Sequence, residues 1–148
     1  MWSQKKFLEL TSSDFYDIIK LRTDIFVVEQ KRIYHEVDEE DKKAVHLYYR
    51  DDVTGQLWAY ARIFREDDGQ LTFGRVVTAP AARGKGLGNQ LLDHILAYCQ
   101  AKCPGETIKI EAQQQVVGFY EKHGFVAQGE PFIFNNTPHV LMTYTKKG

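Results

Sequence analysis

The chain has 148 residues, a formal net charge of −1, and 43% hydrophobic and 26% charged residues. These values predict one soluble globular domain over residues 1–148 and exclude a global electrostatic field that would attract nucleic acid or anionic membranes. No apolar run reaches bilayer length and the start lacks a secretory signal pattern, so we expect a cytoplasmic protein with no membrane partner.

The first half of the chain is predicted as a strand, a helix and three further strands. Residues 5–10 form the first predicted strand, and Thr11 to Asp14 offer N-cap candidates for an amphipathic helix that runs to about Gln30. The charged stretch 31–42 shows no period and is predicted as a loop. The three strands that follow are predicted at 44–50, 56–65 and 71–78.

The second half alternates helices and strands. An apolar stripe from Leu87 to Cys99 predicts an amphipathic helix that ends at Cys103-Pro104-Gly105. Next come a central strand at 107–112, a helix at 116–123 closed by Gly124, strands at 125–127 and 140–145, and a loop at 131–138 between them. This order predicts an α+β fold with a mixed sheet. The two cysteines have no second ligand pair, so no metal site is expected.

A glycine-rich basic turn lies between the strand ending at Thr78 and the helix that follows. Its core is Arg83-Gly84-Lys85-Gly86-Leu87-Gly88. Glycines let backbone N–H groups face a ligand, and a helix N-terminus with two cations attracts anions. Asn89 stands where a dinucleotide fingerprint needs its third glycine, and Gly86 stands where a P-loop needs Ser or Thr. The turn is therefore predicted to bind a pyrophosphate of another kind.

Two motifs carry a resemblance to a known family. Arg83, Gly86 and Gly88 fill the pattern R-x-x-G-x-G, and the segment Phe119-Tyr120-Glu121-Lys122-His123-Gly124-Phe125 is similar to F-Y-x-x-x-G-F. With both motifs in this order and a strand between them, the chain resembles the GNAT family of N-acetyltransferases over nearly its whole length. The resemblance implies a mixed, mostly antiparallel sheet flanked by helices, with acetyl-CoA as co-substrate.

A finer resemblance is to the ElaA-like branch of that family, which is poorly defined in substrate. The matching positions are Arg22, residues 25–30, Tyr34, Glu36, Asp38, Asp41, His46, residues 74–76, Ala112-Gln113 and residues 138–142. Arg32-Ile33 departs from the branch, because a small residue or Cys with Pro is expected before Tyr34.

The resemblance implies a set of cofactor-binding positions. Backbone N–H groups of the turn would hold the CoA pyrophosphate, and backbone groups of the preceding strand would bond the pantetheine, as an added strand does. The implied positions are Val76, Val77, Thr78, Arg83, Gly84, Lys85, Gly86, Gly88, Asn89, Gln113 and Lys122.

Catalytic roles follow from the same resemblance. Tyr120 is the candidate general acid, because a phenol can stabilise or protonate the CoA thiolate as it leaves. His46 and Glu111 are candidates for the base that deprotonates the amine, with Glu29 and His139 as further candidates and an ordered water as the alternative.

The acceptor site is less explicit in the sequence. Arg22, Glu29, Gln30, Arg75 and His139 are candidates for it, and a buried structural ion pair between Arg22 and Glu29 is the alternative. The acidic run from Glu36 to Asp41 would draw a cationic substrate or form a solvated face. By contrast, Arg62 and Arg75 would suit an acceptor that bears a carboxylate.

We therefore predict an acetyl-CoA-dependent N-acetyltransferase without a metal. It would act by direct attack in a ternary complex on the primary amine of a small molecule or peptide. The alternatives are a non-catalytic acyl-CoA-binding module and an acyltransferase for longer chains. A homodimer is left open, and no nucleic-acid partner is expected.

Overall fold

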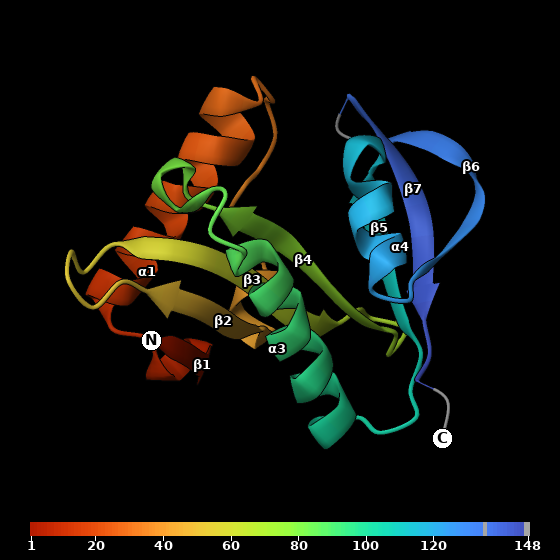
Figure 1. The fold of residues 1–148 in the computed structure, drawn as a ribbon, viewed down its shortest axis with the longest axis horizontal. Helices are drawn as coiled ribbons and strands as arrows, with labels where there is room; N and C mark the ends of the chain where they lie inside the picture. The colour runs from red at the N-terminus through yellow and green to blue at the C-terminus, as the bar shows by residue number, and fades with distance from the viewer. Residues whose placement is uncertain (135, 147–148) are drawn as a thin grey trace.

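A seven-stranded sheet of order β1-β2-β3-β4-β5-β7-β6 organises the chain in the computed structural model, which describes residues 1–134 and 136–146 (Figure 1). Every neighbouring pair is antiparallel except β4 and β5, which are parallel. The strands are Trp2–Lys6 (β1), Val45–Arg50 (β2), Leu57–Arg65 (β3), Leu71–Thr78 (β4), Ile108–Gln113 (β5), Val126–Phe134 (β6) and Thr137–Tyr144 (β7). The predicted α+β fold with a mixed, mostly antiparallel sheet is confirmed.

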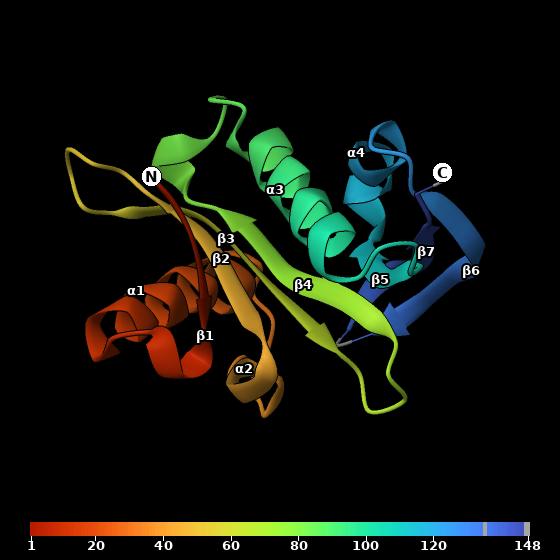
Figure 2. The same cartoon turned by 90° about the horizontal axis from the view of Figure 1, so that it is seen from below.

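Helices cover both faces of the sheet, with α3 and α4 on one side and α1 and α2 on the other (Figure 2). The α-helices are Ser12–Arg22 (α1), Glu40–Lys43 (α2), Leu87–Lys102 (α3) and Val117–Lys122 (α4). Shorter or wider helical turns are Phe7–Glu9 (η1), Thr23–Glu29 (η2), Pro80–Ala82 (η3) and Gln114–Val116 (η4). No helix within the described ranges is both long and apolar enough to cross a membrane.

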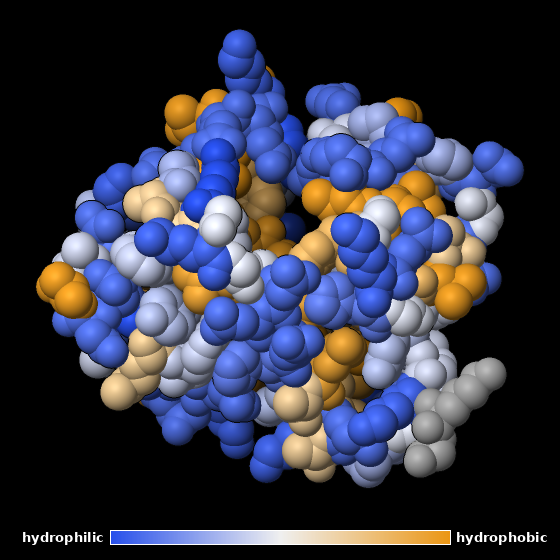
Figure 3. Space-filling model, in the orientation of Figure 1, coloured by the Kyte–Doolittle hydropathy of each residue, from blue (hydrophilic) through white to orange (hydrophobic). Residues whose placement is uncertain are grey.

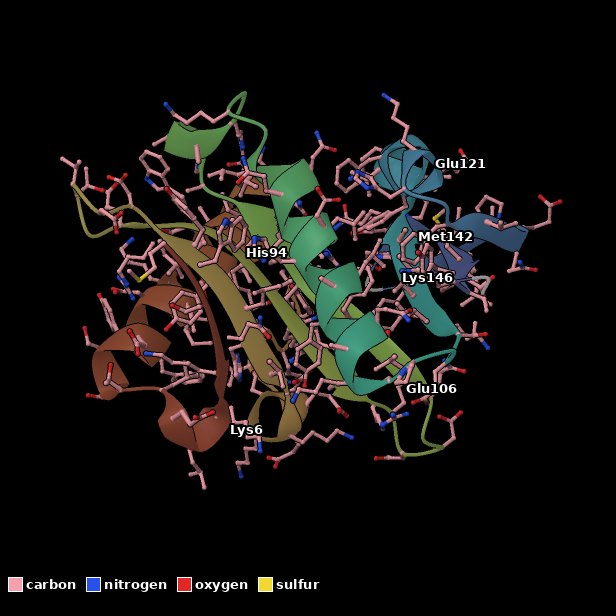
Figure 4. The ribbon with its side chains drawn as sticks, turned by 60° about the horizontal axis from the view of Figure 1, so that its bottom comes forward. Lys6, His94, Glu106, Glu121, Met142 and Lys146 are labelled. Atoms are coloured by element: carbon pink, nitrogen blue, oxygen red, sulfur yellow. The ribbon has the colours of Figure 1, made fainter. Side chains whose placement is uncertain are left out.

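The alternation of β3 divides the core between the two faces. Ala59 and Ala61 belong to the cluster beneath α3, whereas Tyr60 packs with the apolar side of α1. At the edge of the α3 layer, His94 of α3 contacts Trp2 of β1 with ring centroids 4.3 Å apart (Figure 4). The sheet is therefore buried on both faces along its central strands, and this packing holds in place the strands and helices that form the site.

Two predicted elements at the ends of the chain are wrong. The first strand is Trp2–Lys6 and not 5–10, because the Glu9 carboxylate accepts a bond from the Lys6 backbone N–H at 2.8 Å and turns Phe7–Glu9 into η1. The predicted loop 131–138 contributes to β6 and β7. Pro131 fits there because β6 is an edge strand with a register shift between Gln128 and Phe132.

The predicted N-terminal helix changes its winding part of the way along. It is α-helical through Arg22 and continues as the π-helical turn η2 to Glu29. Thr11 caps its start, with its hydroxyl accepting from the Asp14 N–H at 3.0 Å. The charged stretch after it contains α2, which the sequence pattern did not indicate.

Candidate active site

The sheet opens between its two parallel strands. Leu71 and Ile108 form the only registered pair of β4 and β5 in the described part of the chain, and the strands diverge beyond it (Figure 1). A cleft of about 1300 Å³ occupies this opening, and Figure 3 shows the surface hollowed between the halves that carry α1 and α4. Its walls come from β4, from β5 and from the loop between η2 and α2.

A bulge in β4 shapes one wall. Gly74 pairs with Arg62 and Val77 with Tyr60, so Ala61 falls opposite two residues. Arg75 adopts a positive φ of 52°, which is rare for a residue with a Cβ. The bulge interrupts the regular pairing of β4 with β3 at Arg75 and Val76, two residues that line the cleft.

The glycine turn has the geometry that its sequence predicts. Gly84 and Gly86 adopt φ values of 82° and 74°, which strain other residues. A Cβ added to either would meet no heavy atom within 4 Å, so the turn borders open space. Gly86 is the N-cap of α3, and no side chain caps this end of the helix. The first N–H groups of a 16-residue helix therefore remain available to an anion.

The two sequence motifs meet in space. A Cβ on Gly88 would lie 3.8 Å from the Phe119 ring, and the Asn89 Oδ1 lies 2.9 Å from the His123 Nε2. Figure 4 locates α4 by Glu121, above the β7 residue Met142. The start of α3 and the body of α4 thus lie side by side, so one ligand can contact both.

Tyr120 of α4 lies between this junction and the cleft. Its side chain is 6% exposed and lines the cleft. Burial raises the pKa of its hydroxyl, so the group stays protonated at neutral pH. No hydrogen-bond partner for the hydroxyl exists within residues 1–134 and 136–146. A buried, protonated and unpartnered phenol at a cleft is suited to donate a proton.

The remaining predicted cofactor residues divide into two groups. Val76 and Gln113 line the cleft, whereas the side chain of Val77 belongs to the core beneath α1. Lys122 is exposed on α4. Gln113 donates from Nε2 to the Gln30 Oε1 at 3.1 Å, which ties β5 to the end of η2 across the cleft.

The cations of the turn already have contacts. Arg83 donates to the Glu29 carboxylate at 2.8 Å, and both side chains are about half exposed. The Lys85 ammonium lies 5.4 Å from the centroid of the Trp58 ring. Thr78 pairs with Ala59, next to these contacts. Glu29 therefore belongs to the turn and not to the cleft wall that we expected it to form.

Of the two alternatives for Arg22, the structure shows the buried structural ion pair, but its partners are Glu36 and Asp41 and not Glu29. Arg22 is fully buried and donates to the Glu36 carboxylate at 2.6 Å and to the Asp41 carboxylate at 2.7 Å. Arg75 also donates to Glu36, at 3.1 Å. Arg22 is therefore structural and lies outside the cleft wall.

The acidic run divides into two parts, because Glu36, Asp38 and Asp41 pair with arginines whereas Glu39 and Glu40 pair with Lys42 and Lys43 nearer the solvent. Burial opposes ionisation of Asp41, but hydrogen bonds and charges from Arg22 and Arg62 outweigh it, so its pKa lies below the usual value. Arg62 also holds Asp38, with 2.6 Å between Nη1 and Oδ1. Glu36, Asp38 and Asp41 thus hold the loop against α1, β3 and β4 through ion pairs with Arg22, Arg62 and Arg75.

His46 lies in the core, outside the cleft. Its Nδ1 lies 2.6 Å from the Tyr60 hydroxyl and its Nε2 lies 2.9 Å from the Asp41 carbonyl oxygen. Burial lowers its pKa, so the ring is neutral and structural. Glu111 and His139, in contrast, line the cleft from β5 and β7. The His139 Nδ1 lies 2.8 Å from the Thr137 carbonyl oxygen.

Sequence reasoning missed several cleft residues. Arg32, Tyr34 and Glu66 line the cleft, and none was a candidate. The usable signal for this region is Arg32-Ile33, which departs from the ElaA-like pattern directly before the matching Tyr34. Among residues 1–134 and 136–146, no group of three or more His, Cys, Asp and Glu side chains is arranged to hold a metal ion.

Comparisons with known proteins agree with this geometry. A family model described as an acetyltransferase (GNAT) domain matches residues 20–146. Escherichia coli ElaA is 32% identical over 95% of this chain and 94% of its own, and a UPF0039 protein of Schizosaccharomyces pombe is 37% identical over 93% and 92%. The crystal structure of an acyl-CoA N-acyltransferase from Pseudomonas aeruginosa has a TM-score of 0.90 at 36% identity, covering 98% of this chain and 99% of that one. The ElaA crystal structure has a TM-score of 0.90 at 31% identity, covering 97% and 98%.

Proposed function

Because the chain belongs to the GNAT acetyltransferase family and resembles its ElaA-like members, we propose that it transfers an acetyl group from acetyl-CoA to a primary amine. The acceptor is a small molecule or a peptide. The observation that carries the proposal is the junction of the uncapped α3 N-terminus with α4, beside the free hydroxyl of Tyr120.

The proposed donor site runs from the turn into the cleft. Backbone N–H groups from Arg83 to Asn89 bind the pyrophosphate, and the free edge of Val76 to Thr78 bonds the pantetheine amides. Gln113 and Lys122 are secondary contacts. This route places the thioester at the bulge of β4, between the two halves of the sheet.

The proposed chemistry is a direct attack. Glu111 accepts the amine proton, directly or through water, because it is exposed on the cleft wall and carries no ion pair within the described residues. The amine nitrogen forms its bond to the thioester carbonyl carbon, and the carbon–sulfur bond then breaks. Tyr120 donates its hydroxyl proton to the departing thiolate, so no covalent enzyme intermediate is needed.

Donor binding is tested by calorimetry with acetyl-CoA. We expect Gly86→Glu to abolish binding, because it places a carboxylate and a Cβ at the phosphate position. Gly105→Glu is the matched control, since Gly105 has a similar φ of 77°, borders open space and lies past the other end of α3. Equal binding by both variants, or no binding by the wild-type protein, would overturn the donor site.

Catalysis is tested with Tyr120→Phe. We expect kcat to fall about 100-fold with unchanged affinity for acetyl-CoA, because only the proton donor is removed. Tyr98→Phe, on α3, is the control. An unchanged kcat would reject Tyr120 as the acid, and donor binding without turnover on any amine would favour the non-catalytic module. Hexanoyl-CoA in place of acetyl-CoA tests the acyl-chain preference.

A further inference from the structure

One arginine at the cleft lacks the partner that all others have. Arg32 is 9% exposed, lines the cleft and makes no side-chain hydrogen bond or ion pair with residues 1–134 or 136–146. Its Nε is fully buried without an acceptor. Every other arginine of the chain pairs with a carboxylate: Arg22, Arg50, Arg62, Arg65, Arg75 and Arg83.

An unpaired buried guanidinium is unfavourable, and it has no neutral form available. Arginine stays charged at all physiological pH values, so burial cannot be relieved by loss of a proton. Buried charges in proteins are normally paired. Arg32 therefore lacks an anionic partner, and an anion could reach it from the cleft that it lines.

The surroundings hold this guanidinium in a fixed orientation. Its Cζ lies 4.5 Å from the centroid of the Tyr34 ring, and the Tyr34 hydroxyl donates to Glu36. Glu36 is itself held by Arg22 at 2.6 Å. The Arg32 backbone N–H donates to the Val27 carbonyl at 3.1 Å, which fixes the chain at the end of η2. The Tyr34 ring packs against the guanidinium and Nε is buried, so the two Nη groups are the donors left for a bidentate acceptor in the cleft.

The charges elsewhere in the cleft select among anions. Glu66, Glu111 and Glu130 line it without an ion pair within the described residues, and Lys109 is an exposed cation there. Asp38 is neutralised by Arg62 and Arg75. A dianion such as a phosphate monoester would meet this excess of carboxylates. A zwitterion satisfies both ends, because its carboxylate pairs with Arg32 and its ammonium is drawn to the acidic residues.

We propose that Arg32 binds the carboxylate of the acceptor and that the acceptor is an amine of the amino-acid class. This inference rests on the proposed acyl transfer and names its second substrate. Arg62 and Arg75, which the sequence suggested for this role, are already occupied by Glu36, Asp38 and Asp41. Arg32 acts as a specificity residue and takes no part in proton transfer.

Matched acceptor pairs test the proposal. Glycine, β-alanine, γ-aminobutyrate and glycylglycine are each compared with their own carboxamide in a thiol-release assay with acetyl-CoA. The readout is the ratio of kcat/KM for acid over amide in the wild-type protein, Arg32→Gln and Lys31→Gln. Lys31→Gln is the control, because it removes the same charge from an exposed neighbouring side chain. The different basicities of the two amines cancel when the ratio is compared between variants.

We expect a wild-type ratio at least tenfold above that of Arg32→Gln for one or more pairs. The loss should appear as a raised KM for the acid, with the amide and the acetyl-CoA affinity unchanged. Lys31→Gln should keep the wild-type ratio. A ratio that is the same in all three proteins, while amines are acetylated, overturns the proposal and leaves the transferase function intact.

A binding measurement separates the two failures. The same acids are titrated by calorimetry into each protein with CoA present. Acid binding that is lost in Arg32→Gln, without turnover on any amine, supports the carboxylate site and rejects the transferase. Absence of both acid-dependent binding and acid-dependent transfer overturns the carboxylate site.

Discussion

The Arg75 Nε donates to the Glu36 Oε1 across 3.1 Å, and this bond joins the bulged residue of β4 to the loop on the other wall of the cleft. Arg75 reaches Glu36 from a backbone with φ of 52°. The ion pair and the bulge are therefore one arrangement, in which side-chain bonding holds an unfavourable backbone conformation.

Substitution of Arg75 separates these two contributions. Arg75→Gly and Arg75→Ala both remove the ion pair, but only alanine keeps a Cβ at positive φ. We expect Arg75→Ala to be about 1 kcal/mol less stable than Arg75→Gly, because the left-handed conformation costs a non-glycine residue about that much. Urea unfolding of the two variants measures the difference. Equal stabilities would show that the bulge relaxes when the side chain is removed.

The buried ion pairs should carry a large share of the stability of the loop. Arg22→Met leaves Glu36 and Asp41 without their buried donor, and we expect a loss of about 3–5 kcal/mol in the free energy of unfolding. Lys20→Met removes the exposed ion pair of Lys20 with Asp24 and should lower the free energy of unfolding far less than Arg22→Met does. Similar losses in the two variants would contradict the burial argument.

His46 predicts a pH dependence of stability. Burial holds its folded pKa below the ordinary value of about 6.5, so the unfolded chain binds a proton that the native protein excludes. Its contribution is complete above pH ~6.5 and is lost as the pH falls toward the folded pKa, with a slope of at most about 1.4 kcal/mol per pH unit. Chemical unfolding between pH 8 and pH 5 measures this slope.

The matched variants for that experiment are His46→Gln and His35→Gln. His46→Gln should flatten the profile between pH 6.5 and pH 5, whereas His35→Gln, at an exposed position, should leave it unchanged. A wild-type profile that stays flat in this interval would show that folding does not lower the pKa of His46.

Arg32 should behave in the opposite way to Arg22. Arg32→Met removes a buried charge that has no partner within the described chain, so we expect the protein to gain about 1 kcal/mol in stability. The cation–π contact with Tyr34 offsets part of that gain. Thermal unfolding without ligands checks the sign. A loss as large as that of Arg22→Met would mean that the folded protein already satisfies this charge.

The proposed donor side of the site rests on local signals in the sequence. Glycines at positive φ, an uncapped helix start and a motif on α4 are properties of short segments, and the structure brings Gly88 and Phe119 together. The acceptor side depends on contacts between residues far apart in sequence. Arg22 pairs with Glu36 and Asp41 and not with Glu29, which is closer to it in sequence, because Glu29 at the end of η2 pairs with Arg83. The hydrophobic periodicity of the sequence does not indicate this orientation of Glu29.

The single registered pair between β4 and β5 has a consequence for how this protein can change. The facing strand edges offer main-chain N–H and C=O groups, which are the same whatever side chains are present. The loop from η2 to α2 lines the cleft with side chains such as Arg32, through which the proposed acceptor would be bound. In the proposed function, the donor would therefore be bound by main-chain groups that substitution does not alter, and the acceptor by side chains that a single substitution replaces. If the proposed sites hold, descendants of this chain could acquire new acceptors while the donor site stays the same.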